Sequence, residues 1–471
     1  MAWRTVYRLE WRILRRDRSA QLVLGVFAVF LLVAALAGGR AAATLEQGIE
    51  AEVEAERTTE QTHAASLATL GADEPQSARD PRDPVFMGQD GAARTVVLPP
   101  APLAPIAVGQ RDLHPQAVRV TTGVRITSQR ESRTALTGPT RKMSGPFDPA
   151  FLFVMLFPLV IIALSYELLS GERERGTLAM LLSQPVSQTS LVLGKAAARA
   201  TALCAVTIVF ALVGLVVAGA DLGSAQAWLH VGLYVGLLVG WALFWFAAAV
   251  AVNAWSSSSD RNALALVGLW LVLVVIVPGL VSVAVDTFSP PPSGAELEHE
   301  VREAAQDIER ELAGLEGRHD VDPRSAAFSR KKVAVEEKLL AQTRPMLDAH
   351  GASLDDRQAL LGGLRFASPA LIVQLALEDV AGSGATRHRR FARQVDAFHP
   401  EYRAFFTSRI ADAAPFTAAD LAAVPAMAYA PEPTGQLIGR VLVGILFLLV
   451  LAAALLAIAW PGLRRIGRLT R

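Results

Sequence analysis

The chain has 471 residues, of which 52% are hydrophobic, and its mean hydropathy of +0.35 is too high for an ordinary soluble protein. Its 45 basic and 44 acidic residues nearly balance, so the overall charge indicates no nucleic-acid partner. The single cysteine, Cys204, excludes a disulfide framework or a cysteine-based metal site within one chain. These numbers favour an integral membrane protein.

The first 19 residues place basic and aromatic side chains on neighbouring helical stripes. One stripe holds Arg4, Arg8, Arg12 and Arg16, and the other holds Trp3, Tyr7, Trp11 and Leu14. A helix of this kind suits an interface with anionic lipid headgroups. We expect an interfacial elbow helix over residues 1–19, although a plain charge cluster that only fixes topology would show the same arginines.

Six apolar segments are each long enough to cross a hydrocarbon core of about 30 Å as a helix. They cover residues 20–39, 150–168, 200–220, 228–255, 263–285 and 441–460. The sequence therefore predicts an all-α membrane protein with six transmembrane helices and two large insertions between them, at residues 40–148 and 286–435.

Lysines and arginines in the short flanks of the spans indicate which ends face the cytoplasm. Six arginines precede the first span, and residues 461–471 form a basic tail after the last. The loop at residues 169–199 carries four basic side chains, whereas the short loop at residues 221–227 carries none. The pattern predicts that both termini and the 169–199 loop are cytoplasmic and that both insertions are extracytoplasmic.

The first insertion, residues 40–148, begins with strong helix formers that should extend the first span outward. Proline-rich stretches follow, which disfavour regular helix, and "AVRVTTGVRIT" is typical of a short strand pair. We expect this insertion to be loosely structured, with a fold that the sequence does not specify.

The second insertion, residues 286–435, is patterned as helix. Apolar residues from Leu297 to Leu315 and from Phe328 to Met346 each follow one helical face, which predicts an antiparallel hairpin. A further helix carries Phe391 to Ile410 at three- and four-residue steps, and Pro400 should kink it. We expect a mainly helical domain.

The loop after the second span has the sequence "YELLSGERERGTLAMLLSQPVSQTSLVLGK" (residues 166–195) and contains signals for the start and the end of a short helix. Glu172 and Glu174 fall in the first turn of an expected helix, where carboxylates complement the positive helix end. Leucines give that helix an apolar edge, and Pro185 ends it. Such a helix between two spans is either a mechanical part that a cytoplasmic partner pushes or a passive interfacial helix.

Within the fourth expected span, Gly232, Gly236 and Gly240 lie four residues apart. This spacing allows close helix contact, either inside one chain or across a dimer.

No catalytic or cofactor motif is present in the sequence. The Gly194–Lys195 pair is not a phosphate-binding loop, since Thr189 replaces its first glycine and Ala196 replaces its magnesium-binding hydroxyl. The eight histidines show no metal-ligand spacing, and the six apolar cores contain no cluster of ionisable residues. We therefore expect no catalytic residue, no cofactor and no metal in this chain.

The stretch "ERERGTLAMLLSQPVSQTSLVLGK" resembles the signature of permease subunits of ABC-2 type transporters. That signature combines an acidic residue, Gly-Thr-Leu, a leucine-rich turn, a proline and a Gly-Lys pair. The matching positions are Glu174, Gly176, Thr177, Leu178, Leu181, Pro185, Gly194 and Lys195. Residues 367–406 are also similar to a segment of insertion-bearing permeases related to the permease of the nitrous-oxide-reductase copper-maturation system.

This resemblance implies the membrane subunit of an ATP-driven exporter in the bacterial cytoplasmic membrane. The helix at residues 172–182, with Lys195, would dock on a separate ATP-binding subunit that carries the ATP and magnesium. A second permease subunit, identical or different, membrane lipid and an extracytoplasmic protein are the other implied partners. The alternative is a non-transporting membrane anchor or assembly scaffold that presents its external domains to a partner.

Overall fold

The computed structural model describes residues 2–70, 79–109, 111, 115–123, 147–177, 180–181, 187–256, 258–290, 293, 296–297, 299–304, 306, 310, 326–412 and 414–469. Within these residues, six helices are long and apolar enough to cross a membrane, and the two strands are short. The prediction of an all-α membrane protein with six spanning helices is confirmed.

The elements begin with α1 (Ala2–Leu14), α2 (Arg18–Thr69), α3 (Pro84–Phe86), η1 (Met87–Gly91), β1 (Arg94–Val97), η2 (Ala104–Ile106) and β2 (Ala117–Val120). Next come α6 (Pro149–Phe151), η4 (Leu152–Leu156), α7 (Phe157–Ser165), α8 (Ser170–Glu174), α10 (Gln188–Val217), α11 (Ala225–Trp255), α12 (Ser259–Trp270), η5 (Leu271–Ile276) and α13 (Val277–Phe288). The last are α15 (Ala326–Leu364), η6 (Arg365–Ala367), α16 (Pro369–Ala381), α17 (Ala385–Asp412), α18 (Ala418–Ala423) and α19 (Thr434–Leu469).

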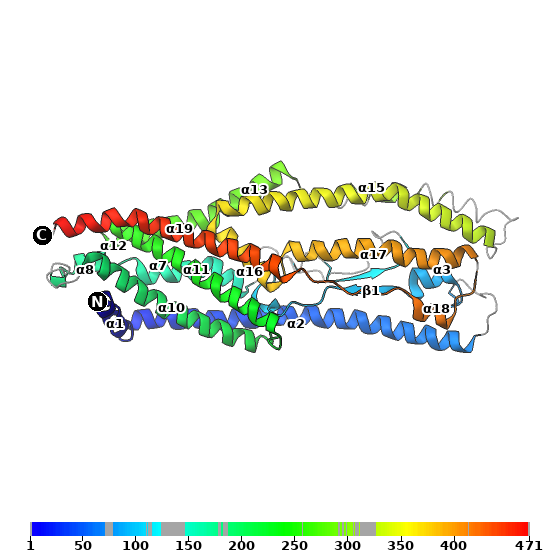
Figure 1. Ribbon diagram of the computed structural model, residues 1–471, viewed down its shortest axis with the longest axis horizontal. Coiled ribbons are helices and arrows are strands. Elements are labelled where there is room, and N and C mark those ends of the chain that lie inside the picture. The colour runs from blue at the N-terminus through cyan, green and yellow to red at the C-terminus, as the bar shows by residue number, and fades with distance from the viewer. Residues whose placement is uncertain are drawn as a thin grey trace.

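The molecule is long, and its two ends differ (Figure 1). The spanning helices form a bundle at one end, where both chain termini lie. The far part of α2 and the helices α15 and α17 extend from this bundle to the other end and enclose the two strands. We call that second region the distal domain.

Helix α11 is the centre of the bundle. In its most apolar window 72% of residues are buried, against 17% for α12–α13, because α11 packs against α7, α10, α12, α16 and α19. Gly236 and Gly240 lie against Ile445 and Leu448 of α19. The small-residue spacing therefore serves packing within the chain at these two positions, whereas a Cβ at Gly232 would meet open space.

Helix α2 is a single rod of 52 residues, about 78 Å at 1.5 Å per residue. Its apolar first part lies in the bundle, and its second part is the outward extension that the sequence predicts. It leaves the bundle at Gly38 and Gly39, where the backbone approaches neighbours closely. A Cβ on Gly38 would lie 2.1 Å from the carbonyl oxygen of Pro105, and one on Gly39 would lie 2.7 Å from the carbonyl oxygen of Ala218.

The described part of residues 40–148 is well packed, so the expectation of a loose segment is wrong there. Strand β2 pairs antiparallel with β1, from Arg94 opposite Val120 to Val97 opposite Ala117. The strand in "AVRVTTGVRIT" thus finds its partner some twenty residues upstream, which local patterning does not reveal. The buried side of this pair joins one apolar core with the buried face of α17.

The helices of residues 286–435 are longer than the sequence suggests. Helix α15 has 39 residues with Pro345 inside it, and α17 has 28 residues and continues through Pro400. Phe391, Val395 and Phe398 are buried on the apolar face that the spacing predicts. Most of the first helix of the expected hairpin, around Leu297 to Leu315, falls outside the described residues.

Helix α16 packs into the bundle rather than with the distal helices. The Ser368 hydroxyl, just before α16, donates to the carbonyl oxygen of Leu273 in η5 at 2.5 Å, and Phe366 contacts Phe447 of α19 with ring centroids 5.1 Å apart. The apolar side chains of α16 belong to the core of the bundle. This segment enters from the distal side and turns back, a position that the prediction of one external domain did not include.

Candidate coupling site

The Glu-Arg-Glu-Arg-Gly-Thr motif lies at the end of the bundle that holds both termini (Figure 1). Its helix, α8, has only five residues and ends at Glu174, because Gly176 has a left-handed φ of 69° that reverses the chain. The Thr177 carbonyl then accepts from the Leu181 amide at 3.0 Å.

The expectation that Glu172 and Glu174 begin a helix running to residue 182 is therefore wrong. The two glutamates close one short helix, and a separate helical turn follows the glycine at Met180–Leu181. Leu178, Leu182 and Pro185 lie outside the described residues, so their expected roles stay predictions.

The Glu174 carboxylate caps the start of the fifth span. Its Oε1 accepts from the Ser259 amide at 2.7 Å, and its Oε2 accepts from the Ser259 hydroxyl at 2.9 Å. The first amides of a helix have no partner within it, and negative charge is favourable there. The sequence argument of a carboxylate at a helix start is thus correct in kind, but the helix is α12.

The Glu172 carboxylate connects the motif to the third span. Its Oε1 accepts from the Lys195 ammonium at 2.6 Å, and the Thr177 hydroxyl donates to its other oxygen. Lys195 is buried, with 7% of its surface exposed, and in the described part of the chain Glu172 is the carboxylate that balances its charge. The structure therefore brings together three of the residues that the motif singles out.

Two buried asparagines, which sequence analysis missed, extend these contacts into the bundle. Asn253 at the end of α11 accepts from the Leu169 amide at 3.3 Å and from Asn262 at 3.1 Å. Asn262 in α12 also donates to the Ser170 hydroxyl at 3.1 Å. Both asparagines are 0% exposed. The sequence signal that could have revealed them is a pair of side-chain amides nine residues apart, at the ends of two apolar segments. A buried amide without a hydrogen-bond partner would be costly there, so each amide should have one.

The elbow helix α1 packs on the same end of the third span. Gly194 lies under it, and a Cβ there would meet Val6 Cγ1 at 2.9 Å. The Arg199 guanidinium bonds the buried carboxylate of Glu10 at 2.9 Å. On its outer face α1 exposes Trp3, an arrangement suited to a membrane surface.

A sequence model described as ABC-2 family transporter protein matches residues 4–460, nearly the whole chain. The chain belongs to the ABC-2 transporter family. It is thus the membrane component, the permease, of an ABC transporter, and this component is not itself catalytic. Such permeases in general work as dimeric membrane assemblies with an ABC ATP-binding partner. No curated protein matches the chain.

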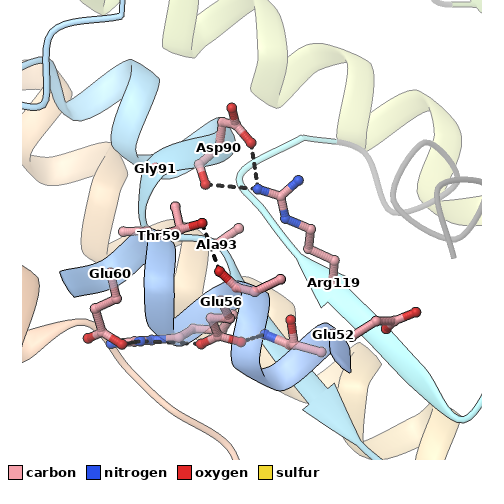
Figure 2. A pocket seen from close by; sticks show the side chains of 12 residues that line it. Glu52, Glu56, Thr59, Glu60, Asp90, Gly91, Ala93 and Arg119 are labelled. Atoms are coloured by element: carbon pink, nitrogen blue, oxygen red, sulfur yellow. Dashed lines mark hydrogen bonds and ion pairs between the residues drawn. The ribbon is translucent and has the colours of Figure 1, made fainter. Parts of the chain in front are cut away.

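The permease has a second polar cluster in the distal domain, around a cavity of about 330 Å³ (Figure 2). Arg94 at the start of β1 donates to Glu60 of α2 at 2.9 Å, and the Thr95 amide donates to Glu56 at 2.6 Å. Across the cavity Arg119 pairs with Asp90. The first two contacts fasten β1 to α2, and the Arg119–Asp90 pair fastens β2 to η1, so the cluster holds the strand pair against its neighbouring helices.

Proposed function

We propose that this permease is the membrane subunit of an ATP-driven exporter in a bacterial cytoplasmic membrane, with α8 and both termini on the cytoplasmic side. The arginines before α2 and after α19 support this orientation, since basic flanks stay in the cytoplasm. The distal domain is then extracytoplasmic. The similarity of residues 367–406 to the insertion-bearing relatives of the nitrous-oxide-reductase maturation permease supports assignment to that subgroup.

A separate ATP-binding subunit, which holds the ATP and magnesium, docks on the segment from α8 to the start of α10. Arg175 and Met180 stand exposed there, and Leu178, Leu181 and Pro185 belong to the same expected contact. The observation that carries the proposal is that the two glutamates of the motif contact two different spans. Glu172 is tied to α10 and Glu174 to α12, so a displacement of α8 reaches the second, third and fifth spans together.

Transport then follows from the two states of the ATPase pair. ATP closes that pair, which moves α8 in two facing permeases, identical or paired with a sister chain, and favours an outward-open bundle. Nucleotide can shift this equilibrium only by its different affinity for the two states. The ion-paired link between α8 and the spans joins the state of the ATPase pair to the state of the bundle. Because of this link, the affinity for nucleotide differs between the inward-open and outward-open states.

The test is Glu174→Ala in the complete transporter, with Asp260→Ala as the matched control. Asp260 is an exposed carboxylate in the first turn of α12, the helix whose start Glu174 caps. No side-chain hydrogen bond to Asp260 is seen among the described residues. We expect the Glu174 variant to keep its fold but to lose most of the permease's stimulation of ATP hydrolysis, while the control keeps it. Equal stimulation in both variants would refute the coupling role.

Wild-type chain that purifies without any ATP-binding subunit would favour the anchor or scaffold function instead.

Sidedness has its own test in a Cys204→Ala background. Met180→Cys and Glu54→Cys place exposed thiols at the two ends of the molecule, since 67% of Met180 and 70% of the Glu54 side chain are exposed. In intact cells, a membrane-impermeant maleimide should label only the Glu54 variant. Labelling of the Met180 variant alone would place the motif outside and overturn the scheme.

A further inference from the structure

A charged cavity of about 390 Å³ lies where α15, α16, α17 and α19 meet, at the junction of the bundle and the distal domain. Four arginines line it, against three carboxylates. The arginines are Arg365, Arg389, Arg393 and Arg440. The coupling scheme uses none of these side chains.

Two of the arginines are already neutralised. Arg389 pairs with Asp355 at 2.7 Å, and Arg440 pairs with Asp379 at 3.1 Å and with both carboxylate oxygens of Glu432. Within the described part of the chain, no carboxylate lies within ion-pair distance of Arg365 or Arg393. The buried Nε of Arg365 also has no hydrogen-bond partner, and its guanidinium lies over the ring of Phe366 at 4.7 Å. Arg365 thus has the Asp379 carboxylate near it but beyond ion-pair distance, and Arg393 is exposed without an ion-paired carboxylate among the described residues.

The first turn of α17 adds to the positive character of the cavity. Gly384, Ala385 and Thr386 line it at the N-terminus of this 28-residue helix. Backbone amides in the first turn of a helix lack hydrogen-bond partners within the helix and favour an anion. The Thr386 hydroxyl is a further group there that can donate a hydrogen bond to an anion. The third carboxylate, Glu378, is buried and accepts from Gln374 at 2.7 Å, so it is turned to its own helix.

The cavity also lies beside an apolar surface at the start of the sixth span. Arg440 stands one turn before Val443, and 48% of Val443 and 62% of Leu446 are exposed on α19 beyond it. We propose that the cavity binds a phosphate-type oxyanion between Arg365, Arg393 and the start of α17, either as the headgroup of an anionic lipid lying along α19 or as a free anion.

The experiment measures binding to the purified full-length chain in neutral detergent by native mass spectrometry and thermal shift. The three probes are phosphatidylglycerol, phosphatidylcholine and inorganic phosphate. The test variant is Arg365→Gln/Arg393→Gln, and the matched control is Arg344→Gln/Arg57→Gln, which removes two exposed arginines outside the cavity.

We expect one phosphatidylglycerol per chain to bind at least tenfold more tightly than phosphatidylcholine, with that preference lost in the test variant and kept in the control. Competition by inorganic phosphate supports the headgroup as the bound group. Saturable phosphate binding that the test variant loses, without any lipid preference, assigns the site to a free anion. Equal binding of every probe by wild type and test variant would overturn the proposal.

Discussion

The two ends of the bundle are closed by different chemistry. At the coupling end, α8 is joined to its neighbours by an ion pair, a carboxylate cap and two buried asparagines. At the distal end, α16 fills the interior of the bundle with small and branched apolar side chains, and its two carboxylates, Glu378 and Asp379, lie at the arginine-lined cavity on its edge. Hydrogen bonds require defined geometry, whereas apolar packing rewards any arrangement that excludes voids. Under the proposed coupling, motion would be transmitted at the first end and accommodated at the second.

The sharpest way to break this contrast is Glu172→Ala, which leaves Lys195 buried without a counter-charge. We expect a loss of about 3 kcal/mol of stability, because breaking one side of a buried ion pair strands the other charge. The midpoint of thermal unfolding in detergent should fall clearly. The double variant Glu172→Ala/Lys195→Met should recover most of that loss, and a failure to recover would show that the pair is not the cause.

At the distal end we expect instead that the stability of the protein depends on pH. Burial raises the pKa of Glu378 to about 7, with Asp379 and Asp148 raising it further and the hydrogen bond from Gln374 opposing this. The folded state therefore holds the proton more tightly than the unfolded state, where a glutamate titrates near 4.3. Stability from this group is fully present below pH 4.3 and is lost as pH rises through 7.

Between pH 4.5 and 8 we expect stability to fall by about 3 kcal/mol through Glu378 alone. Glu378→Gln should flatten the dependence of the unfolding midpoint on pH and raise that midpoint at pH 8. Asp355→Asn, which changes a half-exposed carboxylate at the same cavity, serves as the control. An unchanged pH profile in Glu378→Gln would show that the buried carboxyl does not titrate in this range.

A smaller effect should follow from Gly194→Ala at the coupling end. The added Cβ meets Val6, and forcing a methyl into a packed contact costs about 2 kcal/mol. Fluorescence from Trp3 and Trp11 should shift as α1 moves away from α10. Combining it with Val6→Ala should cost less than the sum of the two single changes, and strict additivity would show that the two residues do not touch.

The smallest effect is expected in the core of the distal domain, from Tyr402→Phe. The Tyr402 hydroxyl donates to the carbonyl oxygen of Ala92 at 2.9 Å, and losing such a bond costs about 1 kcal/mol. Hydrogen exchange should quicken in η1 and β1 and stay unchanged in the spans. Faster exchange in α10 or α12 would show that the two regions do not respond separately.

Hydropathy alone was enough to predict the six spans, because each is a long apolar run that nothing but a bilayer or a buried bundle explains. The motif singled out Glu172 and Lys195 as residues that dock on a partner, but it did not predict that they form an ion pair with each other. The partners of Glu174 and Asn253 could not be foreseen, since Ser259 and Asn262 lie on another span and only the packing angle brings them near. The position of α16 was missed for a related reason, because an apolar helix of 13 residues is too short to be recognised from sequence as part of a bundle of spanning helices.

The unbroken length of α2 has a mechanical consequence. The helix is confined where Gly38 and Gly39 approach Pro105 and Ala218 closely. About 45 Å of α2 continues beyond this point of close contact, up to Thr69. A stiff rod confined at one point acts as a lever about a fulcrum. A tilt of about 5° would sweep the tip at Thr69 through about 4 Å, given 1.5 Å of rise per residue. Under the proposed orientation, a small displacement of the first part of α2 at the cytoplasmic side would thus become a larger displacement of its distal tip.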